Sequence, residues 1–227
     1  MKQVFGMSQN GNLREAANAL TNPQFIMLPS NQTQFEQHVR ELEQLFPGVP
    51  SIGCIGMSYD TKVVENGVGL IGFSDGVQAT ANVLEQVSTM PVKYISRLKD
   101  DLKKIDANAQ NTVCIDFCAG NDACVLTTLN TELKRRGVSL VGGTGDAGKV
   151  SANGYIYEDS VAYGLVRNLH GRVKTYKENI YHQMENYRFI ASQTDRARYV
   201  LGALNGKPAK QVYQSILHVT DEQILTQ

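Results

Sequence analysis

The sequence has no excess of charge of either sign and no block of basic residues. Its 22 lysine and arginine residues are balanced by 22 aspartate and glutamate residues. Proteins that bind the phosphates of a nucleic acid, or an anionic membrane surface, need a surplus of basic side chains on the binding face. We therefore expect neither nucleic acid nor a membrane as a partner of this chain.

Long apolar stretches are missing as well. No apolar run approaches the roughly 20 residues that a membrane-spanning helix needs, and the start MKQVFGMSQNGN lacks the apolar stretch of a signal peptide. We expect a cytoplasmic chain. Its 227 residues suffice to bury a substantial core, either as one large domain or as one domain with part of another.

Cysteine is scarce, and its spacing is not that of a metal site. Cys114, Cys118 and Cys124 are separated by four and six positions, whereas structural zinc sites pair their cysteines across two spacers. With Cys54, they fit a reducing compartment in which cysteine behaves as a small apolar residue. We predict no metal ion and no cofactor. The histidines, which we expect to be solvated or simply packed, are His38, His170, His182 and His218.

A glycine-rich segment resembles a phosphate-binding loop over part of its length. The run from Gly143 to Lys149, GTGDAGK, has the glycine, the four spacers and the Gly-Lys of a P-loop. The next position requires serine or threonine to hold magnesium, but Val150 stands there. A turn and a strand then follow, where a P-loop needs a helix. We therefore predict that the chain binds neither ATP nor GTP.

Hydrophobic periodicity predicts helices and strands in alternation. Apolar residues recur every three or four positions in three segments, which places them on one face of a helix. These segments are 35–46, 95–105 and 126–133. Short apolar runs predict buried strands at 25–28, 51–55, 112–115 and 139–141. Alternating runs predict antiparallel strands at about 68–73, 77–85, 154–167 and 171–179.

The order of these segments repeats along the chain. A strand, a helix, a second strand and a hairpin occupy about 24–86, and the same order occupies about 112–180. The segment Thr61–Gly67 aligns with Gly148–Gly154, and both end in an Asn-Gly pair that we expect to take positive φ in a tight turn. We predict an α/β fold with mixed sheets, built from a duplicated strand-helix-strand-hairpin unit whose helices pack on the sheets.

Glycine and small polar residues follow the paired strands of both copies. In open α/β sheets the loops after such strands meet at one edge, where ligands usually bind. Glycine lets the backbone approach another surface there and leaves amide groups free for an anion or a carboxylate. We predict a small-ligand site without catalytic residues. Its residues are Asn31 and Cys54 in the first copy and Asn121, Asp122, Gly142, Gly143, Thr144, Gly145 and Asp146 in the second.

Two glycine-rich segments carry a family resemblance. The run Val138–Val166 contains LVGGTGD, an Asn-Gly turn, a tyrosine-rich strand and SVAYGLV, and GVPSIGCIG stands earlier at 48–56. These motifs resemble the N-terminal half of the FIST domain, a sensory domain named after F-box and intracellular signal transduction proteins. The resemblance covers roughly 24–180. Thr144 is a departure, because the family commonly has alanine or a similar small residue at that position.

The resemblance implies a sensory domain of a prokaryotic, cytoplasmic signal transduction protein. It implies a small-molecule ligand, with amino acids as the class, and an output module such as a chemotaxis transducer or a kinase. We expect that module to be fused in a longer protein or to be a separate chain. The resemblance also divides the sequence into a FIST N-terminal-type domain over 1–183 and the start of the C-terminal-type region over 184–227.

Other interpretations of the same residues stay open. Asp146 either binds the ammonium group of a ligand or caps a local turn through its own side chain. The glycines either face a ligand or only let strands cross and turn. Cys54 or Cys118 would be the nucleophile of a hydrolase if a histidine remote in sequence lay beside it. The chain would be a structural or interaction module if its own side chains filled the glycine-lined edge.

Overall fold

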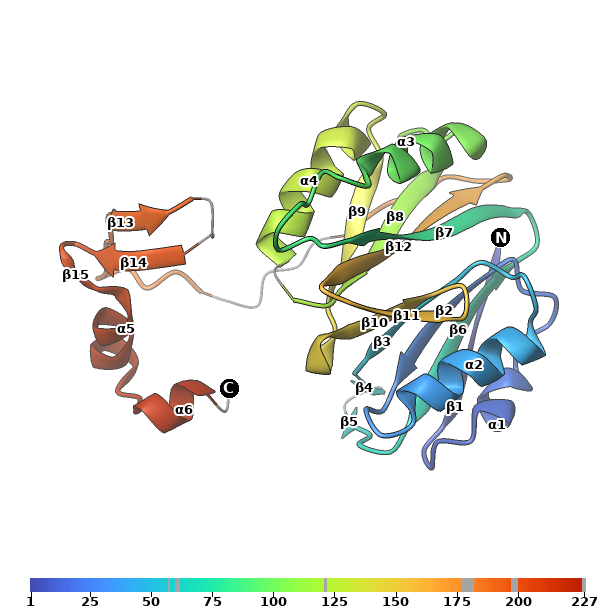
Figure 1. Cartoon of the computed structure of the whole chain (residues 1–227), viewed down its shortest axis with the longest axis horizontal. Helices are drawn as coiled ribbons and strands as arrows, with labels where there is room; N and C mark the ends of the chain where they lie inside the picture. The colour runs from blue at the N-terminus through green and yellow to red at the C-terminus, as the bar shows by residue number, and fades with distance from the viewer. Residues whose placement is uncertain (57, 60–61, 121, 177–181, 197–199, 226–227) are drawn as a thin grey trace. The chain divides into compact units, whose positions relative to one another are not determined.

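The computed structural model describes the chain except residues 57, 60–61, 121, 177–181, 197–199 and 226–227 (Figure 1). For residues 58–59, 62–63, 122–123 and 225 it describes the backbone alone. The chain divides into two units, Met1–Tyr176 and Lys177–Gln227. Among the described residues, no helix is both long enough and apolar enough to cross a membrane.

The first sheet of unit Met1–Tyr176 holds six strands in the order β1-β6-β2-β3-β10-β11. β2 and β3 are parallel, and the other neighbours are antiparallel. β10 pairs with β3 although three strands of the second sheet lie between them in the sequence. The strands are β1 (Lys2–Ser8), β2 (Phe25–Ser30), β3 (Ser51–Ile55), β6 (Val68–Ser74), β10 (Lys149–Ala152) and β11 (Tyr155–Glu158).

The second sheet holds four strands in the order β7-β12-β8-β9. β8 and β9 are parallel, and β12 runs antiparallel to both β7 and β8. Residues 161–166 of β12 are buried on both faces, which explains why this central strand is a nearly continuous apolar run in the sequence. The strands are β7 (Val77–Glu85), β8 (Thr112–Cys118), β9 (Ser139–Thr144) and β12 (Ser160–Asn168).

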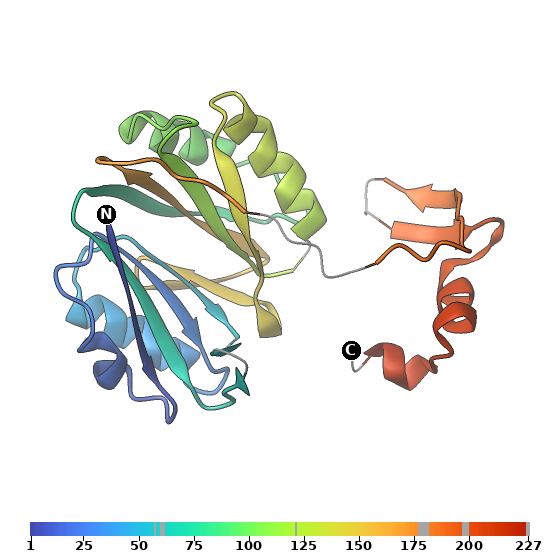
Figure 2. The ribbon, with the colours of Figure 1, turned by 180° about the vertical axis from the view of Figure 1, so that it is seen from behind.

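Helices cover the outer faces of both sheets, and the inner faces pack on each other (Figures 1 and 2). The layers are therefore helix, sheet, sheet and helix. In α2, Phe35, Val39 and Leu42 are buried at helical spacing, so this helix turns one apolar face to the first sheet. The helices are α1 (Leu13–Ala17) and α2 (Phe35–Leu45) on the first sheet, and α3 (Ile95–Lys104) and α4 (Asp122–Lys134) on the second.

Three short elements accompany these layers. β4 (Ser58–Tyr59) and β5 (Lys62–Val63) form a two-stranded sheet of their own, and η1 (Asp146–Gly148) is a 3-10 turn after β9. η1 leads directly into β10. The chain thus leaves the second sheet at the end of β9 and enters the first sheet within a few residues.

The unit Lys177–Gln227 is a small antiparallel sheet followed by two helices. β14 and β15 flank Asn205 and Gly206, whose φ angles of 50° and 78° belong to a tight turn. Of the residues described in this unit, Ala203 is the only buried apolar one. The elements are β13 (Ala191–Asp195), β14 (Val200–Leu204), β15 (Lys207–Pro208), α5 (Ala209–Leu217) and α6 (Asp221–Leu225).

Most predicted elements of the first unit are confirmed. The three predicted helices are α2, α3 and part of α4, and the strands predicted up to residue 167 are present. The strand predicted at 171–179 is wrong for 171–176, because none of the described strands pairs with this segment. Residues 177–179 lie outside the described residues. The sequence patterns did not predict β1 and α1.

The mixed α/β class is confirmed, whereas the duplication is not. The predicted alignment places β6 on β11, but β6 pairs with β2 and β11 pairs with β10. β7 falls in the first predicted copy and yet lies in the second sheet. The two sheets do share a strand order, β1-β6-β2-β3 in one and β7-β12-β8-β9 in the other.

Candidate functional site

The parallel strands of the first sheet end side by side, at the edge where the sequence predicts a ligand site. Ser30 at the end of β2 pairs in register with Ile55 at the end of β3. The N–H of Gly56 then donates to the Ser30 carbonyl oxygen at 2.9 Å, which closes this end of the sheet. The side chain of Cys54, one residue before the end of β3, is 8% exposed.

Asn31, a predicted site residue, is bonded within the chain. Its Nδ2 donates to the carbonyl oxygens of Asn66 and Gly67, at 3.1 Å in each case. Its Oδ1 accepts the N–H of Gln34 at 2.9 Å. These bonds tie the loop before α2 to the turn before β6. The side chain therefore stands at the predicted edge, and its polar atoms hold the loop.

The parallel strands of the second sheet end in the same manner. Cys118 of β8 pairs with Thr144 of β9, and the next N–H, that of Gly145, donates to the Cys118 carbonyl oxygen at 2.9 Å. Within β9, a β-carbon built on Gly142 would collide with the carbonyl oxygen of Asp116. Gly142 is therefore required by the close approach of two backbones, as one of the open interpretations holds.

The two strand ends, one from each sheet, meet. A β-carbon built on Gly145 would lie 2.9 Å from Cys54 Cβ and 3.4 Å from the carbonyl oxygen of Ile55. A β-carbon built on Gly56 would lie 3.5 Å from a carboxylate oxygen of Asp146. The end of β9 therefore lies directly against the end of β3. We call this junction, formed by Cys54–Gly56 and Gly142–Asp146, the strand-end junction.

The surface of the strand-end junction is formed by the second-sheet segment. Gly143, Thr144 and Asp146 are exposed, and Gly145 is buried against β3. Gly143 is exposed, and a β-carbon built on it would have no atom within 4 Å, so the space beside this residue is open to an approaching molecule. The junction thus presents bare backbone beside a carboxylate.

Asp146 carries that carboxylate, and the structure does not show it capping a turn. It is the first residue of η1, and the residue at the N-cap of this turn is Gly145, which has no side chain to form a hydrogen bond. Within the described part of the chain, the carboxylate of Asp146 takes part in no hydrogen bond and no ion pair. An exposed carboxylate beside accessible backbone can bind an ammonium group.

The cysteines of the two strand ends are buried thiols. Burial, and to a smaller extent the charge of Asp146, raises the pKa of Cys54 to about 12. Cys118 is 0% exposed, and its Sγ lies 3.5 Å from the carbonyl oxygen of Gly120. A nucleophilic cysteine must be a thiolate near neutral pH, and Cys54 stays protonated there. The geometry therefore gives no support to a hydrolase that uses Cys54.

Two predicted site residues cannot be placed at the junction. Asn121 lies outside the described residues, and so does the side chain of Asp122, whose backbone begins α4. Among the residues that are described, no group of three or more histidine, cysteine, aspartate or glutamate side chains could hold a metal ion.

The segment that resembles a P-loop has another structure. Lys149 begins β10, and Val150 is 0% exposed within that strand. The ammonium group of Lys149 lies 2.9 Å from a carboxylate oxygen of Glu36 and 3.8 Å from one of Glu158. A phosphate-binding lysine needs a free ammonium group at the start of a helix, so this arrangement agrees with the expectation that no nucleotide binds here.

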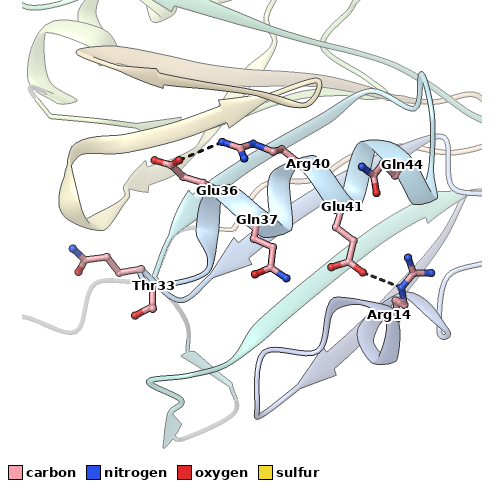
Figure 3. Close-up of a pocket in the computed structure, with 8 residues that line it drawn as sticks. Arg14, Thr33, Glu36, Gln37, Arg40, Glu41 and Gln44 are labelled. Atoms are coloured by element: carbon pink, nitrogen blue, oxygen red, sulfur yellow. Dashed lines mark ion pairs between the residues drawn. The ribbon is translucent and has the colours of Figure 1, made fainter.

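A polar groove, which was not predicted from the sequence, runs along the exposed face of α2 (Figure 3). Its charged side chains face one another in pairs, with Arg14 Nε 3.0 Å from Glu41 Oε1 and Arg40 Nη2 3.6 Å from Glu36 Oε2. Such exposed pairs are typical of a solvated helix face. The groove contains none of the predicted site residues.

A family comparison decides what kind of domain this is. A model described as the FIST N domain matches residues 24–207. The chain belongs to the FIST family. FIST domains are sensory domains associated with signal transduction. The match extends past residue 183, where the sequence analysis ends the N-terminal-type domain, and into the unit Lys177–Gln227. A comparison with curated proteins finds no match to this sequence.

One polar cluster of the FIST chain was not predicted from the sequence. Thr80 and Asn82 alternate along β7 with residues that face the other sheet, and they lie under α3, where Asp101 meets Asn82. The sequence could have indicated this cluster, because two polar residues on one face of a predicted buried strand are unusual. Only the packing of α3 shows that they share one place.

Proposed function

We propose that this FIST domain binds a small ligand at the strand-end junction and reports its presence to an output module. The observation that supports this most is the contact of Gly145 with Cys54, because it brings the open backbone of β9 and the carboxylate of Asp146 to the end of β3. A ligand held there would touch both sheets. Binding would therefore change how the two sheets pack against each other, which is a physical route for a signal.

The chemistry of the strand-end junction favours a small zwitterion, and amino acids are the class that we propose. The carboxylate of Asp146 would accept hydrogen bonds from the ligand's ammonium group. The backbone N–H groups next to Gly143 would donate to its carboxylate. Both groups are exposed in the structure and separated by few residues.

We propose that the protein is a cytoplasmic, prokaryotic signalling component. Its output module would be a chemotaxis transducer or a kinase, either fused or on a separate chain. In this proposal residues 1–183 form the sensory domain, and residues 184–227 begin a second FIST region. Membership of a sensory domain family supports the scheme.

A thermal-shift screen of amino acids and small carboxylates tests the proposal. A ligand that binds only the folded state must raise the melting temperature. For a ligand so found, Asp146→Asn should weaken binding by about 1–3 kcal/mol, the usual contribution of a charge-assisted hydrogen bond. Asp100→Asn is the matched control, since Asp100 is an exposed aspartate on α3, remote from the strand-end junction.

Gly143→Val is the second variant for calorimetry with that ligand. Nothing lies within 4 Å of a β-carbon at this position, so the variant should fold and its side chain should occupy the space the ligand needs. Weaker binding in both variants, with unchanged melting temperatures of the free proteins, is the expected result. Unchanged affinity in both would mean that the glycines of the strand-end junction serve the backbone alone.

A further inference from the structure

A pocket of about 260 Å³ lies at the free edge of β7, apart from the strand-end junction. β7 is an outer strand of the second sheet, and the last turn of α3 lies over this part of it. The pocket is bounded on the other side by the amino end of β3 and the turn after β10. Its polar and charged lining residues include Glu43, Thr80, Asn82, Asp101, Lys104 and Asn153.

The floor of this pocket contains a polar group that lacks a partner. Thr80 is 4% exposed, and among the described residues its hydroxyl has no hydrogen bond. Its neighbours on the same face of β7 are both bonded to α3. Gln78 Nε2 lies 3.5 Å from the Lys104 carbonyl oxygen, and Asn82 Nδ2 lies 3.2 Å from Asp101 Oδ2. A buried hydroxyl without a partner destabilises a protein, so a polar group that reached Thr80 from the pocket would gain a hydrogen bond that the chain itself does not supply.

The wall of the pocket contributes a carboxylate that is already held in position. Asp101 Oδ2 accepts the hydroxyl of Tyr163 at 2.7 Å as well as the amide of Asn82. Both donors are neutral, and Asp101 forms no ion pair within the part of the chain described. Its other oxygen, Oδ1, has no described partner. Glu43 places a second carboxylate at the pocket. The lining therefore has two carboxylates, those of Glu43 and Asp101, and one lysine, Lys104.

We propose that this pocket binds the primary ammonium group of a small organic compound. The ammonium would donate hydrogen bonds to Asp101 Oδ1 and to Thr80 Oγ1, and each of these oxygens would thereby gain a partner. The negative charge of Glu43 would attract the ammonium as well. The volume of the pocket, about 260 Å³, corresponds to about nine water-sized groups at about 30 Å³ each. This site is separate from the strand-end junction, so the two proposals stand or fall independently.

Titration with propylammonium chloride tests the proposal on the whole chain. Propan-1-ol and sodium propionate serve as the neutral and anionic probes of similar shape, at matched ionic strength. We expect saturable shifts of the Ala79 and Ala81 amide signals in nuclear magnetic resonance spectra with propylammonium alone. Asp101→Asn should weaken this binding about tenfold or more, as expected when an ammonium loses a charged acceptor. Asp100→Asn, on the neighbouring position of α3, should leave it unchanged.

Thr80→Val keeps the test valid if loss of the Asp101 charge disturbs the fold. Valine has nearly the shape of threonine and no hydroxyl, so the free protein should melt at the same temperature or higher. Its affinity for propylammonium should nevertheless fall severalfold. Shifts that do not saturate, equal binding of propan-1-ol, or full affinity in Thr80→Val would each overturn the proposal and leave a pocket occupied by water.

Discussion

Buried polar side chains under the first sheet are held by uncharged hydrogen bonds. His38 is 1% exposed, with Nε2 2.9 Å from the Gly11 carbonyl oxygen and Nδ1 2.7 Å from Ser30 Oγ. A carbonyl oxygen can only accept, so Nε2 carries the proton and Nδ1 accepts the Ser30 hydroxyl. Ser30 is 0% exposed, so this serine and histidine stabilise the fold and are not open to a substrate.

We predict that the protein loses stability as the pH falls below about 6.5, the ordinary pKa of histidine. Burial lowers the pKa of His38, and the hydrogen bond to Gly11 and the charge of Glu41 offset only part of this effect. The unfolded chain therefore takes up a proton at a higher pH than the folded one. The stabilisation is complete above 6.5 and declines as the pH falls toward the lowered pKa. Urea unfolding between about pH 8 and about pH 5 measures it.

The control for this prediction is a pair of variants. His38→Gln keeps an N–H donor for the Gly11 carbonyl and cannot titrate, so the free energy of unfolding should depend less on pH below 6.5. His170→Gln changes an exposed histidine and should behave as the wild type. If wild type and His38→Gln lose stability equally, the acid sensitivity has another source.

Nucleotide binding gives a second prediction at the scale of single residues. The hydrogen bond to Glu36 raises the pKa of Lys149, and the side chain is held by two carboxylates at the surface. The next residue, Val150, has no hydroxyl and lies in a strand where a P-loop needs a helix. ATP and GTP should therefore show no saturable heat in calorimetry with magnesium. Lys149→Ala should leave that result unchanged. A micromolar dissociation constant that this substitution abolishes would contradict the prediction.

Two Asn-Gly pairs show how far local sequence determines backbone conformation. Asn153 and Gly154 have φ angles of 49° and 81°, as the dipeptide predicts for a tight turn. Asn66 and Gly67 do not take positive φ. Their carbonyl oxygens accept the amide of Asn31, so a distant residue holds this segment. Asn153 also bonds distant residues, with its N–H donating to the Ser51 carbonyl oxygen at 3.0 Å and its Nδ2 to that of Ala81 at 2.9 Å, so tertiary hydrogen bonds agree with the local signal in one pair and override it in the other.

At the scale of elements, the positions of the strand ends could be predicted from the sequence, but the contacts between strand ends could not. Apolar runs located β2, β3, β8 and β9, and parallel pairing then placed the candidate residues at the ends of those strands. The contact between the ends of β3 and β9 could not be predicted, because it depends on how two sheets pack. β1 was missed because its apolar residues are few and interrupted by polar ones, and it became a strand through its pairing with β6.

The packing of the two sheets leads to a prediction for β12. Gly164 faces the ring of Phe25 across the layer between the sheets, and a β-carbon built there would collide with that ring. Gly164→Ala should lower the free energy of unfolding by about 1–3 kcal/mol, the usual cost of overpacking a core. Urea unfolding measures it. Gly143→Ala adds the same methyl group where nothing lies within 4 Å, and should cost much less.

A third variant tests whether Gly164→Ala lowers the free energy of unfolding through a steric conflict with Phe25 or through a change in backbone freedom. In Gly164→Ala combined with Phe25→Leu, the smaller side chain makes room for the methyl group, so the two costs should not add. Additive costs, or a cost of Gly164→Ala no greater than that of Gly143→Ala, would show that the sheets do not pack this closely.

At the scale of the whole molecule, alternation along a strand predicts a buried face but not the strand that will pair with it. The β10–β11 hairpin illustrates this limit, since it follows β9 of the second sheet in sequence and joins β3 of the first. The predicted duplication is not confirmed at this hairpin. The strand order, which cannot be predicted from the sequence, instead matches β1-β6-β2-β3 of the first sheet with β7-β12-β8-β9 of the second. The chain crosses between the sheets from β6 to β7, from β9 to β10 and from β11 to β12, and the second of these crossings carries Gly145 and Asp146.

The last prediction concerns the independence of the two units. Met1–Tyr176 contains three apolar clusters, whereas Ala203 is the only buried apolar residue among those described in Lys177–Gln227. Folding requires enough apolar burial to offset the ordering of the chain, and a unit of this size with one such residue does not reach it. A chain of residues 1–176 should therefore unfold cooperatively in urea, with a midpoint close to that of the whole protein. Residues 177–227 alone should show no cooperative transition by circular dichroism. Because the strand-end junction lies within the first unit, the chain of residues 1–176 should also bind any ligand found in the thermal-shift screen with full affinity. If this shorter chain folds but does not bind, the ligand site lies elsewhere.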